Sequence, residues 1–436
     1  MSEPAIITLG CRLNAHEGET AAAHARAAAI PDAVIVNTCA VTAESVRQAA
    51  QTIRRIKRDR PDARVIVTGC AAELEPEHFA GLPEVDAVIG NSEKLDPETY
   101  AHIARANGKV VKTGAAALAR SVTPPSPDAA PRTRAILAVQ NGCDHRCTFC
   151  IIPLARGPAR SMPIPDAVAN VRRLVAAGHG EVVLTGVDLT SYGTEMGKPP
   201  ALGRLVRAIL RGVPDLPRLR LSSIDPAEVD AELLDCLQHE PRLMPHLHLS
   251  LQSGDDMILK RMKRRHTSAD AIRFTDRVRS VRPDVAFGAD LIAGFPTESD
   301  EMFANTQATI RACGLTYLHI FPYSARPGTP AARMPQLPQK IVVARAAGLR
   351  QEGRERLADF LASQVGEEHD VLTERGGTGR TPQFAEVVIE GPARAGSIVR
   401  VKVVRHDGRR LIGQPLTGID ASLVSASRRP EIEDRA

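Results

Sequence analysis

The stretch QNGCDHRCTFCIIPLARG, residues 140–157, decides the fold expected for this chain. It carries Cys143, Cys147 and Cys150 in a CxxxCxxC spacing, within one loop that follows a predicted strand. Three thiolates can ligate three irons of a 4Fe-4S cluster and leave the fourth iron open. Zinc would normally need four protein ligands, and His145 in the same loop is a candidate for the fourth. The spacing and the preceding strand favour the iron-sulfur cluster.

An open iron gives such a cluster a specific chemistry. It can bind the amino and carboxylate groups of S-adenosylmethionine and pass an electron into the sulfonium. Cleavage of a carbon-sulfur bond then yields a 5'-deoxyadenosyl radical, which takes a hydrogen atom from an unactivated carbon. The loop therefore predicts a radical enzyme.

Strand and helix patterns alternate around and after this loop. Strands are predicted near Ile136, Val182, Leu219, Leu247, Ala286 and Leu318, and helices near Val168, Leu205, Leu233, Ile272 and Thr309. Six such units predict an α/β architecture, a partial (β/α)6 barrel of parallel strands. The site of such a barrel lies at the carboxyl ends of its strands.

Three further cysteines follow predicted strands near the N-terminus. The expected strands are 5–9, 33–36 and 64–68, and the expected helices are 17–29 and 44–59, which together predict a parallel sheet flanked by helices. Cys11, Cys39 and Cys70 each come directly after one of these strands. A buried cysteine often only fills a core. Their shared position at the carboxyl edge of a parallel sheet favours a joint metal site instead.

Composition excludes several classes of protein. Eight cysteines in a chain of 436 residues do not indicate the disulfide framework of a short secreted domain. The N-terminus lacks a signal-peptide pattern, and no apolar run approaches the roughly 18 residues needed to span a bilayer. We therefore expect a cytoplasmic protein with no membrane partner.

Two basic segments indicate a polyanionic partner. The net charge is only +5, but residues 47–64 hold seven Lys/Arg against two Asp/Glu, and residues 375–413 hold eight against three. Such clusters suit RNA, although a solvated charged face is the simpler alternative for either one. Aromatic residues make up 3% of the chain, so RNA would be held mainly through phosphate and shape.

The sequence resembles the radical S-adenosylmethionine methylthiotransferases over nearly its whole length. Besides the 140–157 loop, the resemblance rests on LGCRLNAHE, NTCAVTAES, VTGC, LTGVDLTSYG, RLSSIDP, HLHLSLQSGDDMILKRMKRRHT, DLIAGFPTES and FPYSARPGTPAARM. It implies an N-terminal domain with an auxiliary cluster, a radical barrel, and a small C-terminal β domain of the RNA-binding TRAM type. The last of these is the weakest part of the match.

The resemblance also implies the cofactors and their ligands, which are two 4Fe-4S clusters and S-adenosylmethionine. Cys11, Cys39 and Cys70 would ligate the auxiliary cluster, and Cys143, Cys147 and Cys150 the radical-generating one. One S-adenosylmethionine would supply the radical and another the methyl group, with sulfur reaching the substrate from the auxiliary cluster. The residues expected to contact S-adenosylmethionine are Asp188, Ser222, Gln252, Ser253, Gly294 and Phe295, although each could instead form a turn or pack in the barrel. Arg156 is expected to contact the cofactor or the substrate, with a surface ion pair as the alternative.

The segment NTCAVTAES followed by QAAQTIRRIKR resembles the branch that modifies N6-threonylcarbamoyladenosine beside the anticodon of transfer RNA. The alternatives are N6-isopentenyladenosine in transfer RNA and an aspartate of a small-subunit ribosomal protein. An alternative of another class is a non-catalytic RNA-binding protein that contains zinc. Basic residues in KRMKRRH, 260–266, could complement a threonylcarbamoyl carboxylate, a weak argument because they suit any RNA.

These expectations divide the chain into five parts and give it several partners. The parts are the N-terminal domain 1–113, a linker 114–134, the barrel with a trailing helix 135–363, the β domain 364–425 and a tail 426–436. The expected partners are the transfer RNA substrate, an electron donor such as flavodoxin or ferredoxin, and a sulfur donor.

Overall fold

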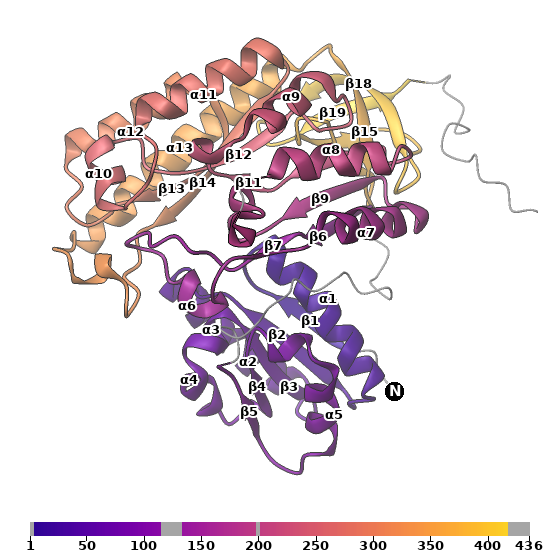
Figure 1. The fold of residues 1–436 in the computed structure, drawn as a ribbon, viewed down its shortest axis with the longest axis vertical. Helices are drawn as coiled ribbons and strands as arrows, with labels where there is room; N and C mark the ends of the chain where they lie inside the picture. The colour runs from indigo at the N-terminus through magenta and orange to yellow at the C-terminus, as the bar shows by residue number, and fades with distance from the viewer. Residues whose placement is uncertain (1–3, 115–132, 198–200, 417–436) are drawn as a thin grey trace, which may run out of the picture. The chain divides into compact units, whose positions relative to one another are not determined.

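Five parallel strands form the N-terminal sheet (Figure 1). In the computed structural model, which describes residues 4–114, 133–197 and 201–416, they lie side by side in chain order. They are β1 (Ala5–Thr8), β2 (Ala33–Thr38), β3 (Arg64–Gly69), β4 (Ala87–Ile89) and β5 (Val110–Lys112). The residues of β2 are all buried, as expected for a parallel strand covered on both faces. The predicted parallel sheet is confirmed.

Helices cover both faces of this sheet. They are α1 (Arg12–Ala27), α2 (Ala43–Asp59), α3 (Cys70–Leu74), α4 (Pro76–Ala80) and α5 (Pro97–Arg105). Apolar residues of α2 pack with Val34, Val36 and Val65, whereas those of α1 and α5 pack with Ile35 and Ile66. Because successive side chains of a strand point to opposite faces, α2 covers one face and α1 with α5 the other.

The next six strand units form a partial barrel. The strands β6 (Arg134–Ala138), β9 (Glu181–Thr185) and β10 (Leu219–Leu221) make one parallel sheet. A second parallel sheet holds β11 (Ser223–Ile224), β12 (His246–Gln252), β13 (Ala286–Ala293) and β14 (Leu315–Pro322). A single residue, Ser222, separates β10 from β11, so the two sheets continue one another. The predicted (β/α)6 architecture is confirmed.

Helices connect the barrel strands and pack on their apolar residues. They are α7 (Ile164–Ala176), α8 (Leu202–Gly212), α9 (Ala231–His239), α11 (Ser268–Val281) and α12 (Asp300–Ala312). Along β12, Leu247, Leu249 and Leu251 belong to this core, whereas His246 and His248 alternate with them and face the barrel interior. None of the described helices is both long and apolar enough to cross a membrane.

The chain divides into two compact units, Met1–Leu357 and Ala358–Ala436. The second unit begins within α13 (Gln339–Ser363) and contains a closed β barrel, which confirms the small C-terminal β domain. Its strands are β15 (Glu368–Thr373), β16 (Thr378–Arg380), β17 (Glu386–Ile389), β18 (Ile398–His406) and β19 (Leu411–Pro415). Most of the predicted linker and the whole predicted tail lie outside the described residues.

Candidate metal centres

The three N-terminal cysteines lie at the carboxyl edge of the N-terminal sheet. Cys11 occupies the N-cap of α1, Cys39 follows β2, and Cys70 begins α3. Gly10, with φ +112°, approaches so closely that a Cβ there would lie 3.1 Å from the Cys39 sulfur. Burial raises the pKa of Cys39 to about 11, and the nearby Cys70 and Cys11 thiols also raise it. The structure thus brings the three predicted auxiliary ligands together as free thiols.

The second cysteine set lies in the loop after β7 (Gln140–Asn141). The Cys150 N–H donates to the Cys147 carbonyl at 3.1 Å, and the Cys143 N–H donates to the Gly157 carbonyl at 3.2 Å, which closes the loop. Burial raises the pKa of Cys150 to about 12, with a further contribution from the Cys147 thiol. Bound metal would supply the positive charge that such buried thiolates need. Both cysteine sets therefore fit iron-sulfur clusters.

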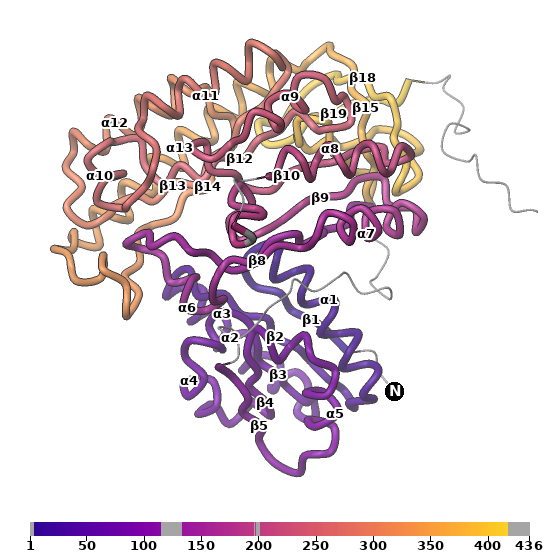
Figure 2. Tube along the Cα trace, viewed as in Figure 1, coloured from indigo at the N-terminus to yellow at the C-terminus, as the bar shows by residue number. Residues whose placement is uncertain are grey.

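Arg156 joins the two sets. It ends α6 (Ile152–Arg156), which begins two residues after Cys150 and lies beside α3 (Figure 2). Its Nε–H donates to the Cys70 sulfur at 3.2 Å, and its two Nη atoms donate to both Glu17 carboxylate oxygens at 2.7 and 3.0 Å. The Nη atoms also donate to Asn14 Oδ1 at 2.6 Å and Asn141 Oδ1 at 3.1 Å. All five N–H groups of the guanidinium are thereby used.

The carboxylate of Glu17 is buried from solvent and pairs with two cations. Both it and Arg156 are 2% exposed, and Lys94, which is fully buried, places its Nζ 2.6 Å from Glu17 Oε2. Although burial opposes ionisation, Arg156 and Lys94 hold the pKa of Glu17 well below its usual range. Lys94 also donates to Asn91 Oδ1, and Asn91 donates to the Ala155 carbonyl at 2.8 Å. This network fastens the N-terminal sheet to the loop of the second cysteine set.

Asp188, one of the predicted cofactor residues, lies beside the second cysteine set. Its Oδ2 is 3.8 Å from the Cys143 sulfur and 2.7 Å from His145 Nε2, and it accepts from the Ser191 hydroxyl at 2.7 Å. Hydrogen bonds to Asp188 and Glu228 raise the pKa of His145 to about 9. The ligand atoms of Cys143, His145 and Asp188 lie close enough together to hold a metal ion.

Ser222 and Gln252 lie at strand ends of the barrel, as predicted. The Ser222 hydroxyl is buried and has no hydrogen-bond partner among the described residues. Gln252 ends β12 with φ +69°, an uncommon conformation for a side-chain-bearing residue. A buried hydroxyl without a partner costs free energy, so Ser222 is suited to a bound ligand.

The other predicted cofactor residues lie within turns or in the core. Ser253 accepts from the Asp255 N–H at 3.2 Å and lies 3.3 Å from the Thr306 hydroxyl. Gly294 has φ +74° and donates its N–H to Glu298 at 3.0 Å. Phe295 is fully buried and meets Tyr323 edge to face. Contacts of these residues and of Arg156 with S-adenosylmethionine stay predictions.

Arg264 is a site residue that the sequence interpretation did not single out. It donates to Asp225 Oδ2 at 2.9 Å and to the Ser250 carbonyl at 2.6 Å, and its Nη1 lies 3.8 Å from the Cys147 sulfur. Arg265 also pairs with Asp225, at 2.8 Å. Two cations of the KRMKRRH segment therefore already hold a protein carboxylate. The basic composition of this segment does not predict that Arg264 and Arg265 pair with Asp225.

The barrel interior holds a second group of side chains absent from the predictions. His248 Nε2 lies 3.0 Å and His319 Nδ1 lies 3.3 Å from the same oxygen of Asp290. These residues come from β12, β13 and β14, which are neighbours in the sheet. The alternation of polar and apolar residues in HLHLSLQ is a signal that could have placed His248 inside the barrel, but only the strand register shows that the three side chains meet.

Comparison with known proteins agrees with this arrangement. Residues 137–310 match the radical SAM superfamily, and residues 4–90 match a family described as uncharacterized, UPF0004. The chain is 46% identical to the threonylcarbamoyladenosine tRNA methylthiotransferase of Rickettsia prowazekii, over 92% of this chain and 94% of that protein. It is 37% identical to the protein of the same name from Thermotoga maritima, over 85% and 86% of the two chains.

A protein with another substrate in its name is also similar. The tRNA-2-methylthio-N(6)-dimethylallyladenosine synthase of Cereibacter sphaeroides is 35% identical over 94% of this chain and 97% of its own length. Among solved structures, the radical S-adenosylmethionine methyltransferase of Kitasatospora setae superposes with a TM-score of 0.53. That match covers 76% of this chain and 75% of the other at 18% identity, which supports the fold alone.

Proposed function

This chain belongs to the radical S-adenosylmethionine tRNA methylthiotransferases, and we propose that it converts N6-threonylcarbamoyladenosine beside the tRNA anticodon to its 2-methylthio derivative. Sulfur and a methyl group are added at C2 of the adenine. The observation that carries the proposal is the meeting of two cysteine triads from separate sheets, linked by the Arg156–Cys70 hydrogen bond, in a chain of this family. The named relatives favour the threonylcarbamoyl substrate.

Each cysteine triad is assigned one cluster. Cys11, Cys39 and Cys70 hold the auxiliary cluster, and Cys143, Cys147 and Cys150 hold the radical-generating one. The family's cofactors, two 4Fe-4S clusters and S-adenosylmethionine, supply the electron, the radical, the sulfur and the methyl group when bound. The proposed cofactor-contact set is Asp188, Ser222, Gln252, Ser253, Gly294 and Phe295, for which the strand-end positions of Ser222 and Gln252 are the strongest support. Arg156, the seventh residue predicted for this set, already uses all five guanidinium N–H groups on protein partners, so we assign it a positioning role instead.

The protein's own side chains fix positions in this reaction. Arg156 holds the loop of the radical-generating triad against Cys70, and Glu17 with Lys94 keeps that guanidinium in place. Asp188 accepts a hydrogen bond from His145 and so fixes the imidazole beside Cys143. Because these groups are paired with one another, they orient the two centres, and none of them is assigned a proton-transfer step.

The remaining assignments follow from the family and from the domain order. The N-terminal domain is placed at 1–113, the barrel with its helix at 135–363 and the RNA-binding β domain at 364–425, joined by the 114–134 linker. A flavodoxin or ferredoxin would deliver electrons, and a separate donor would replace the sulfur consumed. We place the protein in the cytoplasm, where transfer RNA is modified.

Mass spectrometry of tRNA nucleosides from cells with and without the gene tests the substrate. We expect 2-methylthio-N6-threonylcarbamoyladenosine to disappear in the deletion strain and to return when the gene is restored. Loss of the isopentenyl counterpart instead would favour the second candidate, which the similarity to the dimethylallyladenosine enzyme supports. An unchanged nucleoside profile would contradict both tRNA substrates. The remaining candidate would then be the aspartate of a small-subunit ribosomal protein. Family membership gives no support to the non-catalytic zinc alternative.

A further inference from the structure

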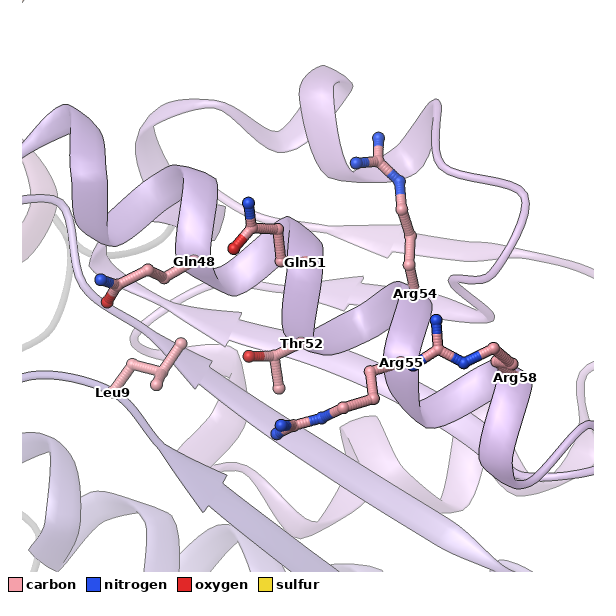
Figure 3. Close-up of a pocket in the computed structure, with 7 residues that line it drawn as sticks. All are labelled: Leu9, Gln48, Gln51, Thr52, Arg54, Arg55 and Arg58. Carbon is pink, nitrogen blue, oxygen red and sulfur yellow. The ribbon is translucent and has the colours of Figure 1, made fainter.

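We propose that the outer face of α2 is a docking surface for the phosphate backbone of the tRNA substrate. The inference rests on the proposed function, and it adds an RNA contact in the N-terminal domain to the one expected in the C-terminal β domain. A groove of about 540 Å³ lies along this helix and is lined by Leu9, Gln48, Gln51, Thr52, Arg54, Arg55 and Arg58 (Figure 3).

The cations of this groove are available for a ligand. Arg54 and Arg55 are exposed, and neither side chain forms an ion pair or hydrogen bond with another described residue of the chain. Other cations of the same helix differ, since Arg47 pairs with Glu44 and Lys57 pairs with Asp86 at 3.2 Å. Among the described residues, the Arg58 side chain pairs only with the exposed carboxylate of its sequence neighbour Asp59, at 3.5 Å. The cations that line the groove are therefore those of α2 with the fewest ion-pair partners among the described residues.

The arrangement of charge along α2 favours a polyanion. Residues 45–58 contain no acid, and Arg58 lies three and four residues after Arg55 and Arg54, positions that are neighbours on a helix surface. Like charges at this spacing repel and destabilise an isolated helix. Packing compensates, because Val46, Ala49 and Ile53 bury the opposite face of α2. A row of bound phosphates would neutralise these arginines and remove the repulsion between them.

The chemistry of the groove suits phosphate rather than bases. Its lining contains no aromatic side chain on which a base could stack, and its neutral polar members, Gln48, Gln51 and Thr52, can donate hydrogen bonds to phosphate oxygens. Arg54 and Arg55 leave the helix in different directions in Figure 3, so they would reach different phosphates. Binding here would therefore depend on charge and not on RNA sequence.

The groove also has the right position for a substrate of this enzyme. Leu9 lies two residues before Cys11, so one end of the groove reaches the edge that carries the auxiliary triad. From Gln48 to Arg58 the helix extends about 15 Å, enough to follow several phosphates. The Ala43 N–H donates to the Ser324 hydroxyl at 3.0 Å, which fixes the start of α2 to the segment after β14. RNA along α2 would thus lead toward the cysteine edge.

Salt-dependent tRNA binding by the full-length holoenzyme tests this inference. The R54Q/R55Q variant should lower the slope of log affinity against log salt by about 1.5, because each lost phosphate contact contributes 0.7 to 0.9. Affinity at low salt should fall about tenfold. The R54K/R55K variant should restore most of both, since lysine also binds phosphate as a point charge.

R47Q is the matched control, because Arg47 stands on the same helix but is paired with Glu44. Its slope should stay close to that of the unaltered protein, and RNA-independent cleavage of S-adenosylmethionine should be unchanged in every variant. Equal slopes for R54Q/R55Q and the unaltered protein would overturn the inference, as would an equal loss in R47Q. Absence of tRNA binding by the unaltered protein would instead overturn the proposed function, and this surface with it.

Discussion

The Nε–H of Arg156 donates to the Cys70 sulfur at 3.2 Å, although the two residues are 86 positions apart in the chain. Cys70 begins α3 of the N-terminal domain, and Arg156 ends α6, which precedes α7 of the barrel. Arg156 follows the radical-generating triad in the chain, whereas Cys70 belongs to the auxiliary triad. Hydrogen bonds to cluster sulfurs are among the factors that set reduction potentials. With the auxiliary cluster on Cys70, as proposed, this contact would position the radical-generating loop and also act on the cluster electronically.

Replacing Arg156 by glutamine should make the reduction potential of the auxiliary cluster more negative. The variant loses the donor to Cys70, and a thiolate ligand without that donor favours the oxidised cluster. The measurement is a redox titration followed by electron paramagnetic resonance, in a background with Cys143, Cys147 and Cys150 changed to alanine so that only the auxiliary cluster is present.

E17Q is the control for a merely structural effect of R156Q. It disturbs the same buried network but leaves the Arg156 side chain able to donate to Cys70. Its potential should stay closer to that of the unaltered protein at equal iron content. An R156Q potential identical to that of the parent would remove the electronic role and leave only the positioning one.

Stability should depend on the ionisation of Glu17. Its pKa is held low in the folded protein by Arg156 and Lys94 despite burial, so its carboxylate stabilises the fold above the unfolded-state value near 4.5. That contribution is lost as pH falls through the depressed folded-state pKa. At pH 7, E17Q should lower the free energy of unfolding by about 3 kcal/mol, because it leaves buried cations uncompensated.

Urea denaturation of the unaltered protein and of E17Q across pH 3 to 8 measures this linkage. The difference between the two should be constant above about pH 5.5 and should shrink as the solution is acidified. A difference that instead grows toward low pH would show that Glu17 is protonated in the folded state and that the network is assigned wrongly.

Local patterns predicted the strands and both cysteine triads. The N-terminal triad follows three strand ends that hydrophobic periodicity identifies, and the other triad lies in one loop after a predicted strand. The network around Arg156 was not predictable in this way. Its contact with Glu17 joins residues 139 positions apart, and only the packing of α1 against β6 brings them together. Likewise, the burial of Phe295 in a turn and the pairing of Arg264 with Asp225 depend on tertiary contacts that composition does not encode.

The two cysteine triads should have separable effects on the reaction. Changing Cys143, Cys147 and Cys150 to alanine should abolish formation of 5'-deoxyadenosine, because the cluster that binds S-adenosylmethionine for cleavage is then missing. Changing Cys11, Cys39 and Cys70 should preserve that cleavage and stop sulfur insertion. Each variant should retain about four of roughly eight irons. Cleavage that survives in both triple variants would show that the clusters are assigned to the wrong cysteines.

Gly294, at the end of β13, should not tolerate a side chain. Its φ of +74° disfavours any other residue, and an added Cβ would lie 2.8 Å from Val342 Cγ2 and 2.9 Å from the Val342 Cα. G294A should therefore lower the free energy of unfolding by about 2–4 kcal/mol, as backbone strain and overpacking add. The control is G178A, because Gly178 has φ +89° but nothing within 4 Å of the added carbon, so it measures strain alone. Equal destabilisation of the two variants would mean that α13 moves away without cost, and that this turn is less firmly held than its contact with Val342 indicates.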